Sequence, residues 1–259
     1  MLTEPRVLVI IPARWASSRF PGKPLANISG VPMVQRVVEQ AKKAKSVSEV
    51  IVATDDSRIL NLVEENGGTA IMTSAGHESG TDRVAEVARE RDCDIVVNVQ
   101  GDEPLIPPQN IDQVVKPLIE DSSISVTSLR ILIQDTNDLL NKNITKVVVD
   151  RFDSALYFSK APIPWDRDSW SEGMDNFSSL SSSKWFKHIG LYAYRKQFLL
   201  EYSSLPTSPL EKIGKLEQLR ILENGFLIKV VETQLDSIGV DSQADIKIIE
   251  KQLALSPEI

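Results

Sequence analysis

The sequence predicts an α/β fold built on a doubly wound, mostly parallel (mixed) sheet. Apolar runs of strand length alternate four times with stretches of helical spacing between residues 7 and 121, which is the pattern of successive βαβ units. Of the 259 residues, 42% are hydrophobic and 25% are charged, as in an ordinary globular protein. No linker or internal repeat interrupts the chain, so we expect one domain over 1–259, with halves 1–125 and 126–259.

The first half is predicted to contain four strand–helix pairs. Strands are expected at 7–11, 49–53, 69–72 and 95–99, and helices at 32–45, 57–66, 81–91 and 110–121. The first strand is expected to stop at Pro12, because proline cannot donate to the ladder of a central strand. Gly67 is typical of the left-handed residue that ends a helix. Ligands of such sheets bind outside the carboxyl ends of the strands, where residues 12–25, 55–56 and 100–104 would meet.

The second half is less regular. Strands are expected at 125–133, 146–149, 155–159, 186–194 and 227–231, with the first three as a candidate antiparallel addition to the sheet. Helices are expected at 216–223 and 243–253, and 237–241 has the character of a strand. Two prolines exclude a helix and a central strand at 161–165. The serine-rich stretch 169–183 is expected to be an exposed loop.

Charge and composition exclude several classes of protein. The net charge of −7 and the lack of a basic tract argue against binding to nucleic acid or to an anionic membrane. The single cysteine, Cys93, excludes an internal disulfide framework and a cysteine metal cluster, and we expect it in the core. No run approaches the roughly 20 apolar residues of a membrane span, and no signal peptide is evident. We therefore expect a cytoplasmic protein.

The loop after the first strand is the leading candidate for a binding site. Arg14, Arg19 and Lys23 lie in a segment rich in small residues, against an acidic background. Small residues let backbone N–H groups approach an anion, and arginine can grip phosphate with two bonds. The loop thus favours a nucleoside triphosphate, although three cations alone are equally compatible with a solvated loop. Pro24 after Lys23 excludes a P-loop, and the absence of G-x-G-x-x-G argues against an NAD-dependent dehydrogenase.

Acidic residues follow two of the strand-like runs. Asp102 comes just after the most strand-like run, where a carboxylate suits Mg²⁺ together with phosphate oxygens and water. Taken alone, Asp102 is more simply interpreted as a capping or loop residue, and capping is also the simpler interpretation of Asp241 and Asp56. His77 and His188 lack ligand spacing, so we do not expect a zinc site.

Other candidates keep two readings each. Residues 79–83 form a helix start that suits an anion or a polar ring, or that is simply capped. His188 either contacts an acidic ligand or lies on the polar face of a strand. Arg167 faces an anionic substrate or solvent. Glu217 and Gln218 fall on a predicted helix, where a solvated face is the plainer reading.

The stretch IPARWASSRFPGKPL at 11–25 resembles the signature loop of sugar nucleotidyltransferases. Nine further stretches occur in the same order along the chain. Together they resemble one family of sugar nucleotidyltransferases, the 3-deoxy-manno-octulosonate cytidylyltransferases. They are VATD (52–55), HESGTDR (77–83), VNVQGDEP (97–104), ALYFS (155–159), IPWDRD (163–168), HIGLY (188–192), SPLE (208–211), LEQLR (216–220) and GVD (239–241). The serine-rich stretch 169–183 shows only loose agreement.

This resemblance implies a Rossmann-like nucleotidyltransferase core with a small dimerisation element. Residues 1–125 would be the nucleotide-binding half, and 126–259 the sugar-binding and dimerisation half. The resemblance further implies a homodimer that transfers CMP from CTP to 3-deoxy-D-manno-octulosonate (Kdo), with Mg²⁺, for lipopolysaccharide biosynthesis. A related acid sugar, such as 8-amino-Kdo or sialic acid, is the close alternative. An inactive nucleotide-sugar-binding subunit is disfavoured, because Lys23, Asp102 and Asp241 are all present.

The resemblance also implies a role for individual residues. Arg14, Arg19 and Lys23 would hold the triphosphate, and Ser79, Gly80 and Gln100 would surround cytosine and ribose. Asp102 and Asp241 would ligate Mg²⁺ and, with Lys23, form the catalytic set. The Kdo pocket would be lined by Gln100, Arg167, His188, Tyr192, Glu217 and Gln218, with Arg167 and His188 facing the sugar carboxylate.

Overall fold

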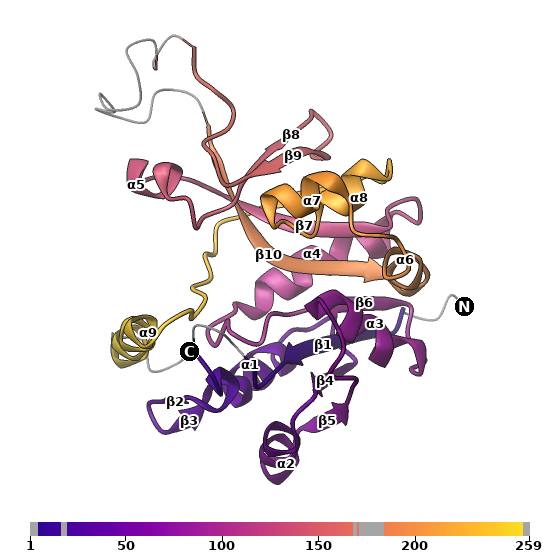
Figure 1. Ribbon diagram of the computed structural model, residues 1–259, viewed down its shortest axis with the longest axis vertical. Coiled ribbons are helices and arrows are strands. Elements are labelled where there is room, and N and C mark those ends of the chain that lie inside the picture. Colours follow the sequence, from indigo (N-terminus) through magenta and orange to yellow (C-terminus); the bar gives the residue numbers. More distant parts are fainter. Residues whose placement is uncertain (1–4, 17–19, 168–169, 171–183, 256–259) are drawn as a thin grey trace.

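The computed structural model describes residues 5–16, 20–167, 170 and 184–255 (Figure 1). The strands are β1 (Val7–Ala13), β2 (Asn27–Ile28), β3 (Val31–Pro32), β4 (Glu49–Thr54), β5 (Thr69–Met72), β6 (Ile95–Asn98), β7 (Val126–Leu132), β8 (Lys146–Val149), β9 (Ala155–Ser159), β10 (Phe186–Arg195) and β11 (Lys229–Thr233). The helices are α1 (Met33–Lys42), α2 (Ser57–Glu65), α3 (Gly80–Arg89), α4 (Pro108–Glu120), α5 (Thr136–Leu140), α6 (Lys196–Tyr202), α7 (Pro209–Gly214), α8 (Leu219–Glu223) and α9 (Gln243–Leu255), with a 3-10 turn, η1, at Lys23–Leu25.

One mixed sheet organises the chain and confirms the predicted fold class. Its main path runs β11-β7-β10-β6-β1-β4-β5. All neighbours on this path pair in parallel except β10, which is antiparallel to both β6 and β7. The β8–β9 hairpin adds to β10, and β2 and β3 form a separate pair. The sheet thus joins strands from both halves of the chain.

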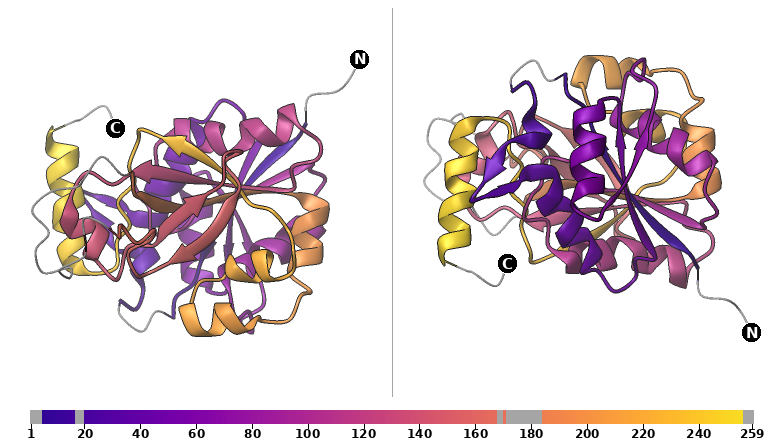
Figure 2. Two further views of the ribbon diagram at one scale, coloured as in Figure 1. Left: turned by 90° about the horizontal axis from the view of Figure 1, so that it is seen from above. Right: turned by 90° about the horizontal axis from the view of Figure 1, so that it is seen from below.

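Helices cover both faces of the sheet, as a doubly wound fold requires. Alternate residues of β1 point to opposite faces: Val7, Val9 and Ile11 pack with α1, α2 and α4, whereas Leu8 and Ile10 pack with α3, α6 and α8. The four predicted strand–helix pairs are therefore confirmed. Figure 2 shows α9 at one side of the molecule, beside the β2–β3 hairpin, against which it packs through Ile249.

The predicted end of the first strand at Pro12 is wrong. β1 continues through Pro12 to Ala13 beside β4. The carbonyl of Ile10 accepts a hydrogen bond from the backbone N–H of Val99, which directly follows β6. Pro12 lies two residues further on, so its backbone nitrogen also faces the β6 side. Because β6 has already ended at Asn98, the missing N–H of proline removes no ladder hydrogen bond.

The strand character expected at 237–241 is also wrong. This segment follows β11 as irregular backbone and is held by the loop after β6. Its Val240 N–H donates to the carbonyl of Asp102 at 2.8 Å, and the Ser237 hydroxyl donates to Glu103 Oε2 at 2.7 Å. Hydrogen bonds to a loop thus replace the strand partner that apolar residues suggested.

Other boundaries differ less. β11 begins and ends two residues later than predicted, and α4 begins two residues earlier. The short helices α5, α6 and α7 were not expected. Cys93 is buried, as predicted, and Asp56 caps α2 by accepting a hydrogen bond from Arg58 N. Within the residues that the structure describes, no helix has both the length and the apolar character of a membrane span.

Candidate active site

The site lies where the order of strands reverses. From β1 the chain passes through α1 to β4 on one side, whereas β6 pairs with the opposite side of β1 after crossing the other face through α3. In such sheets the loops leaving the two central strands diverge and open a crevice at their carboxyl ends. Arg14 follows β1 and Gln100 follows β6, so the two loops predicted to bind the nucleotide border this crevice.

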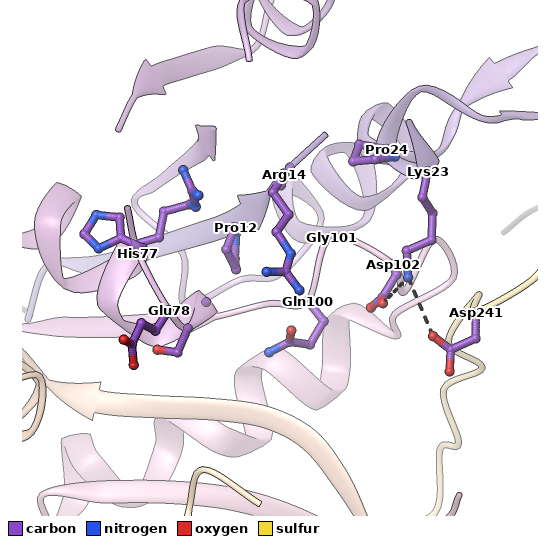
Figure 3. Close-up of a pocket in the computed structure, with 14 residues that line it drawn as sticks. Pro12, Arg14, Lys23, Pro24, His77, Glu78, Gln100, Gly101, Asp102 and Asp241 are labelled. Atoms are coloured by element: carbon purple, nitrogen blue, oxygen red, sulfur yellow. Dashed lines mark hydrogen bonds and ion pairs between the residues drawn. The ribbon is translucent and has the colours of Figure 1, made fainter. Parts of the chain in front are cut away.

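A cavity of about 280 Å³ occupies the crevice (Figure 3). Most of its lining comes from residues that the sequence singled out. The lining consists of Pro12, Ala13, Arg14, Lys23, Pro24, His77, Glu78, Ser79, Gly80, Arg83, Gln100, Gly101, Asp102 and Asp241. We call this space the first cavity. It joins the loop after β1, the start of α3, the loop after β6 and the segment before α9.

Lys23 brings two distant acids together in this cavity. Its Nζ lies 2.6 Å from Asp102 Oδ2 and 3.8 Å from Asp241 Oδ1, and it donates to the carbonyl of Val240 at 2.8 Å. Figure 3 shows the ammonium group between the two carboxylates, which come from different segments. The sequence left capping as the simpler reading of Asp241. The structure instead places its carboxylate in the first cavity, facing Lys23.

The loop after β6 approaches β1 closely because it carries no side chain at Gly101. A Cβ built there would lie 2.7 Å from the carbonyl oxygen of Pro12, closer than any real contact. Glycine therefore lets Asp102 sit against the end of β1.

The neighbouring carboxyl of Glu103 is buried, and burial raises its pKa to about 7.

Helix α3 points its first turn at the cavity. Ser79 caps it, accepting a hydrogen bond from Asp82 N at 3.1 Å. One turn on, the guanidinium of Arg83 is buried and donates to Asp55 Oδ2 at 2.7 Å and to the Thr73 hydroxyl. Capping and the buried ion pair thus fix the helix start, whose positive dipole suits an anion or a polar ring.

A second cavity, of about 400 Å³, lies on the β10 side of the first. Polar side chains and tyrosines dominate its walls. It is lined by Thr81, Asn98, Gln100, Thr145, Lys160, His188, Gly190, Tyr192, Tyr194, Tyr202, Lys215, Leu216, Glu217 and Gln218. Gln100 lines both cavities, so its side chain stands where the two spaces meet.

His188 is held at the wall of the second cavity by a break in the sheet. The register of β10 against β7 shifts between Ile189 and Tyr192. The Ser128 hydroxyl fills this break, 2.8 Å from His188 Nε2 and 2.9 Å from the carbonyl oxygen of Leu191. Burial lowers the pKa of His188 to about 3, so the ring is neutral at ordinary pH and offers hydrogen bonds rather than charge to the second cavity.

Two other groups in the second cavity favour a polar ligand. The hydroxyl of Tyr192 is buried and has no hydrogen-bond partner among the described residues. A buried polar group without a partner is costly, and a ligand hydroxyl or carboxylate would satisfy it. Burial raises the pKa of Glu217 above its usual range.

The remaining predicted residues fall in three different places. Arg19 lies outside the described residues. Arg167 is exposed and lines neither cavity. Glu217 and Gln218 do line the second cavity, but they precede α8 rather than belong to it. Bonds between residues three apart, such as Arg220 N to the Glu217 carbonyl at 3.1 Å, form a tight turn there, and this turn aims Glu217 inward.

Sequence reasoning missed several residues that line the cavities. Asn98 had a usable signal, since an amide within an otherwise apolar central strand needs partners, and it bonds Thr81 and Gln100 at 3.4 and 3.5 Å. Tyr202 gave none, because an aromatic residue on a helix usually packs in the core. Its hydroxyl donates to the Glu217 carbonyl at 3.1 Å.

The acids of the first cavity bear on metal binding. The described residues contain no group of three or more His, Cys, Asp and Glu side chains arranged to hold a metal. Asp102 and Asp241 are two carboxylates drawn to one cation, Lys23. Mg²⁺ is typically held by one or two carboxylates, with phosphate oxygens and water completing the shell, so this donor pair fits that ion.

Comparisons with known proteins agree with this geometry. The cytidylyltransferase family model matches residues 8–234. The 3-deoxy-manno-octulosonate cytidylyltransferases of Geobacter metallireducens and Geotalea daltonii are each 53% identical over 247 residues, which is 95% of this chain and 97% and 98% of theirs. A solved structure of CMP:2-keto-3-deoxy-manno-octonic acid synthetase complexed with CTP is 40% identical, with a TM-score of 0.88, and covers 96% of this chain and 99% of its own.

Similarity over 95% of the chain includes the residues of both cavities and the segment that carries Asp241. The motifs found in the sequence had indicated the same family. By its sequence and its fold, the chain belongs to the 3-deoxy-manno-octulosonate cytidylyltransferase family.

Proposed function

We propose that this chain transfers CMP from CTP to Kdo, releasing pyrophosphate and forming CMP-Kdo for lipopolysaccharide biosynthesis. The names of its relatives support the reaction. The single observation that carries it is the meeting of two polar cavities at Gln100. The first holds cations and paired acids, and the second holds hydroxyl, amide and imidazole groups beside Lys160 and Glu217. CTP would occupy the first cavity and the sugar the second.

This arrangement suits direct transfer without a covalent enzyme intermediate. The anomeric hydroxyl of Kdo would attack the α-phosphorus of CTP as pyrophosphate leaves on the opposite side. Arg14 and Lys23 would carry positive charge to the phosphates, and Gln100 would orient both substrates at the boundary. Positioning and charge neutralisation supply most of the catalysis in such reactions.

We also propose Mg²⁺ as the cofactor, with Asp102 and Asp241 as its protein ligands. When bound, the ion would supply positive charge beside the α-phosphate and the attacking hydroxyl. Lys23 would then exchange its contacts with the two acids for contacts with phosphate oxygens. The donor set of two carboxylates supports this proposal.

The second cavity supports an acid sugar as the acceptor. The hydroxyl of Tyr192 and the neutral ring of His188 offer hydrogen bonds to hydroxyl or carboxylate oxygens. Lys160 adds positive charge to the wall. Residues 1–125 contribute most of the first cavity and 126–259 most of the second, which is consistent with a nucleotide-binding and a sugar-binding half.

The experiment is direct. The purified protein is mixed with CTP, Kdo and Mg²⁺, pyrophosphate is measured continuously, and the sugar nucleotide is identified by mass spectrometry. We expect turnover with CTP and Kdo, and much lower kcat/KM with sialic acid, with 8-amino-Kdo or with other nucleoside triphosphates. The Geobacter metallireducens relative serves as positive control. Absence of turnover under conditions where that enzyme is active would refute the proposal.

We further propose a cytoplasmic homodimer. Phe152 and Leu227 are 62% and 69% exposed and line one hollow near the β8–β9 hairpin, which gives a second copy an apolar surface to cover. Sedimentation velocity measures the oligomeric state. A monomer at micromolar concentration would contradict this part of the proposal and leave the reaction itself untouched.

A further inference from the structure

The segment that carries Asp241 has no regular structure of its own, yet it is held on several sides. The backbone of Val240 bonds the carbonyl of Asp102 through its N–H and Lys23 Nζ through its carbonyl, both at 2.8 Å. The Val240 side chain is fully buried in a small core with Ile28 and Ile249. These contacts fix Val240, the residue before Asp241. The backbone of Asp241 itself is held by a different contact, from helix α9.

Asp245 supplies that second attachment. It lies in the first turn of α9, and its Oδ2 accepts three hydrogen bonds. They come from Asp241 N at 2.9 Å, Ser242 N at 2.8 Å and the Ser242 hydroxyl at 2.9 Å. The bond from Ser242 N is the return half of a capping box, in which a carboxylate in the first helical turn reaches back to the N–H of the cap residue. Here the carboxylate reaches one residue further, to the residue whose side chain lies in the first cavity.

We propose that Asp245 is a positioning residue: by holding the backbone N–H of Asp241, it keeps the Asp241 carboxylate opposite Asp102. Helix α9 is itself anchored, since Ile249 is fully buried and the Ser29 N–H bonds Glu250 Oε1 at 3.1 Å. Asp245 therefore links a docked helix to one acid of the site. The catalytic consequence of this inference rests on the proposed function, whereas the hydrogen bond from Asp241 N to Asp245 does not.

Three variants separate positioning from simple helix capping. Asp245→Ala removes all three hydrogen bonds. Asp245→Asn keeps an oxygen that accepts them but removes the charge. Asp135→Ala is the matched control, because Asp135 caps α5 through Asn137 N at 2.9 Å, and neither Asp135 nor α5 lines the first cavity. Each alanine variant loses one helix cap, so the two proteins should show similar decreases in Tm.

Two measurements that do not depend on turnover decide the question. Hydrogen exchange reports the amides of Asp241 and Ser242, and Mn²⁺ titration followed by electron paramagnetic resonance, with CTP present, reports the paired acids. We expect Asp245→Ala to speed exchange at both amides and to weaken Mn²⁺ binding about tenfold, as loss of a group that orients a ligand does. Asp245→Asn should stay near wild type in both, and Asp135→Ala should change neither.

Two outcomes would overturn the inference. One is normal Mn²⁺ affinity and exchange in Asp245→Ala beside a Tm loss equal to that of Asp135→Ala, which would make Asp245 a cap only. The other is an Asp245→Asn protein as defective as the alanine variant, which would show that charge and not hydrogen bonding matters. Lack of CTP turnover in the wild type would refute the proposed function, whereas the exchange measurement would still decide whether Asp245 holds Asp241.

Discussion

Replacing Lys23 with methionine should strengthen metal binding in the absence of nucleotide while it abolishes turnover. Methionine keeps the length and apolar stem of lysine but removes the ammonium group. In the free protein that group neutralises Asp102 and Asp241, so a divalent cation must displace it. Without it, the two carboxylates lose the positive charge that lies between them and attract a cation more strongly.

The magnitude follows from the two ion pairs. Lys23 Nζ is 2.6 Å from Asp102 and 3.8 Å from Asp241, and the three side chains are 15%, 35% and 57% exposed. Water screens partly exposed ion pairs, so the interaction free energy is about 1 kcal/mol for the closer pair and about 0.5 kcal/mol for the longer one. The sum corresponds to a metal affinity about tenfold higher in Lys23→Met.

Mn²⁺ binding by electron paramagnetic resonance, without nucleotide and at fixed ionic strength, measures this affinity. Lys42→Met is the matched control, because it changes the net charge by the same amount as Lys23→Met. Lys42 is exposed on α1 and lines neither cavity. An affinity for Mn²⁺ in Lys23→Met that is equal to or lower than that of Lys42→Met would refute the competition between lysine and metal. Pyrophosphate release from the same protein should fall to background.

Three further predictions test the site. Asp102→Asn should lower kcat at least a hundredfold with the fold intact, and near-normal kcat would reject its metal role. Gln100→Ala should raise KM for both CTP and sugar, because Gln100 lines both cavities; a rise for one substrate alone would show that it serves only that one. Burial lowers the pKa of His188 to about 3 from 6.5, so the unfolded chain binds a proton that the folded one does not, and stability due to this residue is lost as pH falls below 6.5. From pH 7 to 5, the unfolding free energy of wild type relative to His188→Asn should drop by about 2 kcal/mol in urea titrations; a constant difference would contradict the buried neutral ring.

Much of the fold could be predicted from periodicity. Apolar runs of strand length identified β5, β8 and β9 to the residue, and the alternation with helices identified the doubly wound sheet. The pattern failed where tertiary contacts decide the backbone. Residues 237–241 carry strand-like side chains, but their hydrogen bonds go to a loop. Pro12 was excluded from a strand by a rule that applies only where the neighbouring strand continues.

The candidate site was predicted less completely, for a physical reason. Residues on loops after parallel strands converge by topology alone, so Arg14, Gln100 and Asp102 could be grouped from the sequence. Asp241 follows no strand, and its approach to Lys23 depends on the docking of α9, which no local pattern reveals. The wall of the second cavity comes from many elements, and residues such as Tyr202 look like ordinary core.

The first cavity takes its second acid from a segment that follows β11. The ribosome makes proteins from the amino end, so Arg14, Lys23 and Asp102 leave it long before Asp241 does. A growing polypeptide that has not yet reached Asp241 presents cations with a single acid, and it lacks the pair that would hold a divalent ion. If Asp102 and Asp241 hold the ion as proposed, nucleotide activation would be withheld until the growing polypeptide includes Asp241.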